Sequence, residues 1–141
     1  MATGYLVSVA ELYEAPEDKQ AFEQSRNLLS LANLAEVVEN HFALRVTDWS
    51  SLFSYVSKHW EALPILLEAP EVIRKVFGDV RPILDLVNDP EEGWEELFIV
   101  IPVLEAAPKA LERLERLDSI WFAHAVRRAK FSVNVTVERD V

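Results

Sequence analysis

Three histidines and one pair of carboxylates are the side chains that could bind a metal ion or transfer protons in this 141-residue chain. The histidines are His41, His59 and His124, and none belongs to an H-E-x-x-H pattern, which would place two ligands on one helical face. Glu36 and Glu39 have the helical spacing of a two-carboxylate metal site, but no histidine accompanies them at the third position. This pair therefore indicates a solvated helix face, and we expect no metal ion or other cofactor.

Nucleophilic and nucleotide chemistry lack their usual signatures. Cysteine is absent, which excludes disulfides, thiolate catalysis and cysteine-ligated metal sites. The serines form no G-x-S-x-G elbow, and Gly4, Gly78 and Gly93 are too scattered for a phosphate-binding loop. We therefore assign no catalytic residue and expect that the protein is not an enzyme.

Tryptophan is abundant for a chain of this length, with four residues. Tryptophan is enriched both in large cores and at the centres of protein interfaces, so either role fits. Two of the histidines lie next to aromatic positions at helical spacing, where a histidine either packs in the core or lines a pocket. The residues that could form a pocket or an interface are His59, Trp60, Trp94, Trp121 and His124.

The chain is acidic, with 14 Lys and Arg against 24 Asp and Glu and a formal net charge of −10. This charge disfavours binding to the phosphates of nucleic acids or to anionic lipids. The most apolar run, Leu97 to Leu104, is far shorter than the roughly 20 residues that span a membrane. The N-terminus lacks the basic start of a signal peptide. We expect a soluble cytoplasmic protein with one domain over residues 1–141.

Prolines and capping residues predict helices in the first half of the chain. Pro16 suits the first turn of a helix that should run to about Asn40. Residues 41–47 could finish that helix or form a short strand. Asp48 is placed to cap the next helix, and Gly78 is placed to end the one after it.

Two further helices are expected after residue 88. The stretch Asn88-Asp89-Pro90-Glu91-Glu92 combines a capping residue, a fixed backbone angle and acidic residues, which is typical of a helix start. It predicts a helix through Trp94 to Ile101. An amphipathic helix should then run from Lys109 to about Lys130.

One short pattern occurs twice, as Leu63 to Pro70 and as Ile101 to Pro108, with both prolines in the same places. Because proline and the residue before it disfavour a continuing helix, Leu63 and Ile101 are expected to end or kink helices. The pattern suggests a recurring helix, break, helix unit. Chance similarity in a chain rich in Leu, Ala, Glu and Pro is an equal alternative, since two copies are too few for a solenoid.

The C-terminal segment alternates strictly between apolar and polar residues, which is typical of a strand with one buried face. The N-terminal segment Tyr5 to Val9 shows a weaker alternation and is a candidate partner strand, as is a neighbouring subunit. We therefore predict a mainly α-helical (α+β) fold, a compact bundle of helices punctuated by prolines with a small antiparallel β element formed by the two ends. The residues expected to mediate strand pairing are Phe131, Val133, Val135 and Val137.

These features predict a non-catalytic structural or protein-interaction protein that associates with itself or with a protein partner, as an oligomer or an assembly subunit. The alternative is a small helical pocket protein that binds or transforms an apolar small molecule. A packed interior with an exposed apolar face would favour the first hypothesis. An enclosed pocket that holds a histidine and a carboxylate would favour the second.

Overall fold

The computed structural model describes residues 31–45 and 48–140 of the chain. The chain divides into a unit of residues 1–35 and a unit of residues 36–141. Residues 31–35 of the first unit are helical. The prediction of a single domain over the whole chain stays a prediction, and the sheet and helices below belong to the second unit.

The second unit alternates helical segments with strands. Helical residues 36–41 come first. They are followed by β1 (Ala43–Arg45), α3 (Trp49–Lys58), a 3-10 turn (Trp60–Ala62), α4 (Leu63–Phe77), β2 (Ile83–Asp89), β3 (Trp94–Val103), α5 (Ala107–Leu117), a π-helical turn (Asp118–Phe122), α6 (Ala123–Arg128) and β4 (Val133–Arg139).

The strands within the described residues form one four-stranded mixed sheet in the order β1, β2, β3, β4. β1 runs parallel to β2, and β2 and β3 form an antiparallel hairpin. β4 runs parallel to β3, with Leu97 opposite Val133 and Val103 opposite Arg139. Parallel neighbours need a long crossover. The connection from β1 to β2 contains α3 and α4, and the connection from β3 to β4 contains α5 and α6.

The prediction of an α+β protein is confirmed, but the β element differs from the expected one. The C-terminal alternation forms a strand, β4, as predicted. Among the described residues its partner is the internal strand β3, in parallel orientation, so the expected antiparallel element of the two chain ends is not confirmed. The segment Tyr5 to Val9 lies outside the described residues, so its pairing stays a prediction.

The predicted helix through Trp94 to Ile101 is wrong, because this stretch is strand β3 of a β-hairpin. The Asp89 carboxylate does accept backbone N–H groups, from Glu91 at 2.9 Å and from Glu92 at 3.2 Å, but it does so in the loop between β2 and β3. Gly93 closes the loop with a positive φ of 77° and donates its N–H to the Asp89 carbonyl at 2.7 Å. A short acidic side chain caps a tight turn and a helix start by the same bonds, so the motif alone does not separate them.

The duplicated pattern does not form a repeated structural unit. Leu63 begins α4 instead of ending a helix, and Pro70 lies inside α4. Ile101 lies in β3, and Pro108 occupies the first turn of α5. Pro64 lies in a helix and Pro102 in a strand, and Pro70 lies inside a helix whereas Pro108 lies at a helix start, which favours chance similarity.

Several helix boundaries agree with the predictions. Asp48 caps α3 by accepting the Ser51 N–H at 2.7 Å, and Gly78 ends α4 with a φ of 81°. The expected helix from Lys109 to Lys130 is present as α5, the π-helical turn and α6. Residues 43–45 form a strand, which resolves the alternatives left open there.

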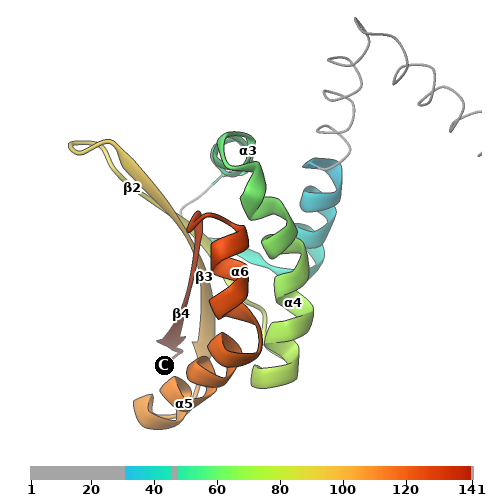
Figure 1. The fold of residues 1–141 in the computed structure, drawn as a ribbon, viewed down its shortest axis with the longest axis vertical. Helices are drawn as coiled ribbons and strands as arrows, with labels where there is room; N and C mark the ends of the chain where they lie inside the picture. The colour runs from blue at the N-terminus through green and yellow to red at the C-terminus, as the bar shows by residue number, and fades with distance from the viewer. Residues whose placement is uncertain (1–30, 46–47, 141) are drawn as a thin grey trace, which may run out of the picture. The chain divides into compact units, whose positions relative to one another are not determined.

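The core lies between the helices and one face of the sheet (Figure 1). Alternate strand residues point to this face, and helices α4, α5 and α6 lie along it in the figure. None of the helices within residues 31–45 and 48–140 is long and apolar enough to cross a bilayer. The core residues with no exposed surface include Ile65, Leu66, Ile73, Leu84, Leu97, Ile99, Ile101 and Val133.

Candidate interaction edge

β4 is the last strand of the sheet, so one of its edges faces away from β3. The orientation of its backbone follows from one hydrogen bond just beyond the strand, in which the Asp140 N–H donates to the Val103 carbonyl at 2.7 Å. Successive residues of a strand direct their N–H and C=O groups to opposite edges. Asn134, Thr136 and Glu138 therefore bond to β3.

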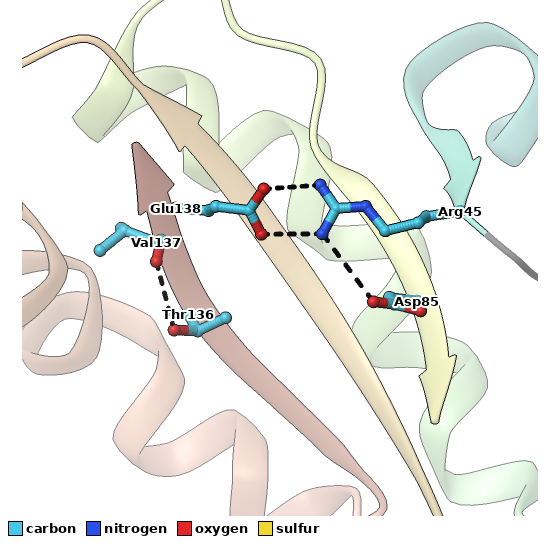
Figure 2. Close-up of polar contacts among 5 residues, drawn as sticks. All are labelled: Arg45, Asp85, Thr136, Val137 and Glu138. Carbon is cyan, nitrogen blue, oxygen red and sulfur yellow. Dashed lines mark hydrogen bonds and ion pairs between the residues drawn. The ribbon is translucent and has the colours of Figure 1, made fainter. Parts of the chain in front are cut away.

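The odd-numbered residues direct their backbone groups outward. No described strand pairs with the outer edge of β4. Val133 is fully buried, so the accessible outward groups are those of Val135, Val137 and Arg139. The hydroxyl of Thr136 lies 3.5 Å from the Val137 carbonyl, which is at the limit of a hydrogen bond (Figure 2). An edge of this kind is a template for the addition of another strand.

An apolar hollow of about 250 Å³ lies beside this edge, between β4 and the helical layer. Val135 of β4 forms one wall. The opposite wall comes from α5 and the π-helical turn, which contribute Leu114, Leu117 and Phe122. Glu115 and Asp118 lie at the same hollow and give it an acidic side. The hollow could accept an apolar side chain from a strand laid along β4.

Exposed apolar side chains occur on the elements next to the hollow. Leu111 on α5 is 52% exposed, and Ile120 in the π-helical turn is 54% exposed. Phe131, immediately before β4, is 70% exposed. Phe131 also has a φ of 62°, a left-handed conformation that costs a bulky residue on the order of 1–2 kcal/mol.

The turn that exposes Phe131 is held by backbone hydrogen bonds at the end of α6. The Phe131 N–H donates to the Val126 carbonyl at 2.8 Å, and the Ser132 N–H donates to the Ala129 carbonyl at 3.0 Å. Tyr55 of α3 donates its hydroxyl to the Ser132 carbonyl at 2.6 Å in a buried position. Burial raises the pKa of Tyr55, so the hydroxyl keeps the proton that it donates. The start of the edge strand is thus fixed by two helices.

The far end of β4 is tied to β1 across the sheet face that carries Asp85 (Figure 2). The Arg45 guanidinium donates to both carboxylate oxygens of Glu138, at 2.7 and 2.9 Å, and lies 3.9 Å from Asp85. The hydrogen bonds from Arg45 lower the pKa of Glu138. The bridge holds the C-terminal end of the edge strand in register although its side chains are exposed.

The five residues predicted for a pocket or interface are spread over several elements. His59 ends α3, with its ring 4.4 Å from that of Tyr55, and Trp60 begins the 3-10 turn. Trp94 begins β3 and is 42% exposed, and His124 is exposed on α6.

Trp121 is the buried member of this set, with 8% exposure. Its indole N–H donates to Glu68 of α4 at 3.0 Å. The hollows described in this section are not lined by any of the five residues. Their role in a pocket or interface stays a prediction.

A second hollow, of about 190 Å³, lies at the C-terminal end of helical residues 36–41 and is open to solvent. It brings His41 and Asp79 to one surface depression beside Arg74 and Arg81. Arg81 donates to the carbonyls of residues 39 and 40 and so caps that helical segment. In the part of the chain that the structure describes, no three histidine, aspartate or glutamate side chains gather at a distance suited to a metal ion.

The hollow beside β4 was missed by sequence reasoning, although a signal for it was present. Leu111, Leu114 and Leu117 have the spacing of one face of α5, yet only Leu117 is fully buried. A helix with more apolar residues than it can bury marks a surface that another chain could cover.

Comparison of the chain with known protein families, with curated proteins and with solved structures gives no match.

Proposed function

We propose that this protein is a non-catalytic interaction protein that binds another polypeptide by strand addition along β4. The observation that carries the proposal is the outward-facing backbone of Val135, Val137 and Arg139 beside an apolar hollow. Strand addition gains affinity from main-chain hydrogen bonds and specificity from pockets for alternate side chains. Both parts are present along this edge.

The exposed apolar residues support the same proposal. Phe131 lies immediately before the edge strand β4. Leu111 lies on α5 and Ile120 in the π-helical turn, and both elements contribute residues to the wall of the hollow. Aromatic side chains are enriched at the centres of interfaces, and the left-handed backbone keeps this one in solvent at a cost to stability.

The alternative of an apolar pocket protein has less support. The depression that contains His41 and Asp79 is open and polar. The apolar hollow beside β4 contains carboxylates but no histidine. A pocket that combines both groups in an enclosed apolar space was the feature expected of that alternative.

A labelled peptide tests the proposal directly. The probe is a synthetic peptide with the sequence of residues 131–140, and its fluorescence anisotropy is measured while the protein is titrated from nanomolar concentration. We expect saturable binding to the wild-type protein and loss of binding to Val137→Pro. Proline removes an outward N–H and is tolerated on an edge strand, so the pairing with β3 should survive.

The matched control is Val137→Thr, which keeps the N–H and the β-branched shape and should bind the peptide as the wild type does. Circular dichroism verifies that both variants keep the wild-type helix and strand content. Equal peptide affinity of Val137→Pro and the wild type, or no saturable binding to the wild type, would overturn the proposal.

A further inference from the structure

We infer that the polypeptide added along β4 is a second copy of this chain, paired antiparallel about a two-fold axis at Thr136. The inference rests on the proposed function and names the partner that the edge fits best. A two-fold interface must be self-complementary, because the same surface meets itself. The sequence and geometry of β4 meet this requirement in three respects.

The first is the hydrogen-bond register. In an antiparallel pair the residues that exchange two hydrogen bonds must both direct their backbone outward, which limits the pairing to odd-numbered residues of β4. An axis at Thr136 places Val135 opposite Val137 of the partner subunit and repeats this pair on the other side of the axis. Val133, whose backbone is buried, is not needed for these bonds.

The second is the match of side chains on both faces. The Val135 and Val137 pairs lie on the helical side, where Val135 already lines the apolar hollow. On the opposite face the axis brings together the two copies of Thr136, and it places Asn134 opposite Glu138 of the partner subunit. Threonine pairs are favourable across strands, and no like charges face each other directly in this register.

The third is charge. The segment before β4 is basic, with Arg127 and Lys130 exposed, whereas Glu138 near the end of β4 and Asp140 just after it are acidic and exposed, and they flank Arg139. An antiparallel pair places the basic end of one copy beside the acidic end of the other. A parallel pair would place like ends together. Complementary charges at the two ends of β4 disfavour the parallel pair. They also allow two copies of an acidic protein to associate along this strand.

The absence of cysteine allows a sharp test. Thr136→Cys introduces a single thiol at the proposed axis, in a pair that is not hydrogen-bonded. The Cα atoms of such a pair are about 4.5 Å apart, which is within the range that a disulfide bridges. Mild oxidation of the full chain, followed by a denaturing gel without reductant, should convert most of the protein to a cross-linked dimer.

Asn134→Cys is the matched control, because it lies on the same strand and the same face. In the proposed register the two Asn134 positions are separated by about four residues along the strands, roughly 13 Å, so a disulfide cannot form without rearrangement. We expect cross-linking of Thr136→Cys at least tenfold faster than of Asn134→Cys. Addition of Val137→Pro to Thr136→Cys should reduce the rate to that of the control.

Equal cross-linking rates for the two cysteine variants would overturn the inference, and so would a monomeric mass of the wild type at every concentration in sedimentation equilibrium. Either outcome would rule out the dimer without ruling out strand addition along β4, which the labelled peptide tests separately. If the labelled peptide binds and Val137→Pro abolishes the binding, the edge accepts a strand whose natural source is another protein or the N-terminal segment of this chain. If the peptide does not bind either, the edge itself has no docking role.

Discussion

Replacement of Glu68 should show how much the contacts of α4 with the π-helical turn and α6 contribute to the free energy of unfolding. The Glu68 carboxylate accepts the Trp121 indole N–H at 3.0 Å and both Arg128 amino groups at 2.7 and 2.8 Å. It therefore joins α4 to the π-helical turn and to α6. The hydrogen bonds from Arg128 are the main reason that the pKa of Glu68 lies below its ordinary value of 4.5.

The expected magnitudes follow from the partners that each substitution removes. Glu68→Gln keeps an acceptor for Trp121 but loses the charge. Hydrogen bonds to a charged group contribute about 1.5–3 kcal/mol, and the 40% exposure of the Glu68 side chain reduces this to about 1 kcal/mol. Glu68→Ala also leaves the N–H of the buried Trp121 without its acceptor, so a loss of about 2 kcal/mol is expected.

The pH dependence of the free energy of unfolding separates the contribution of the Glu68 charge from that of the hydrogen-bond geometry. Because the folded-state pKa is lowered, the carboxylate stabilises the fold above the unfolded-state pKa, and this contribution is lost as pH falls through the folded-state pKa. The difference between the wild type and Glu68→Gln should therefore be full at about pH 7 and should shrink steadily below about pH 4.5.

Urea unfolding followed by circular dichroism at several pH values measures this difference. Glu71→Gln is the matched control, since Glu71 lies one turn away on α4 and contacts Lys75 only at 3.9 Å with 79% of its side chain exposed. It should change the free energy of unfolding little at any pH. A difference between Glu68→Gln and the wild type that is the same at about pH 3 as at about pH 7 would refute the assignment to the charge.

Two further substitutions and one truncation test other parts of the fold. Asp89→Ala should lower the free energy of unfolding by about 1 kcal/mol, because it removes the acceptor of two loop N–H groups, whereas Glu112→Ala on exposed α5 should cost a few tenths; equal urea midpoints would show that the loop bonds do not matter. Tyr55→Phe should cost about 1 kcal/mol through loss of the bond to Ser132, and an unchanged thermal midpoint would contradict this. Truncation after Lys130 removes β4 and uncovers β3, so circular dichroism should show general unfolding; retained helicity would mean that the sheet folds without its fourth strand.

The C-terminal strand could be predicted from the sequence because its information is local. Val133, Val135 and Val137 alternate with polar residues, and a period of two determines both the strand and its buried face. The same alternation does not reveal the neighbouring strand or its direction. These depend on contacts with β3, which lies about 36 residues earlier in the chain, and on the helices that cross between them.

The β2–β3 hairpin could not be predicted from the sequence, because the local signals conflict. Asp89 followed by Pro90 satisfies the rules for a helix start, and Asp89 caps the loop with the bonds that it would use in a helix. The run from Leu97 to Val103 is apolar on both faces, so its periodicity does not separate a buried strand from a buried helix. The decisive contribution comes from pairing on both sides, with β2 and with β4.

The outward backbone of β4 follows from the register of its pairing with β3. The Asp140 to Val103 bond shows that even-numbered residues of β4 bond to β3 and that Val135, Val137 and Arg139 direct their backbone outward. A shift of the β3–β4 register by one residue would reverse this division and would also move the valines from the helical face to the open face. The apolar face is therefore what keeps the outward backbone in place. The burial that stabilises the fold and the edge proposed for strand addition are two consequences of the same register.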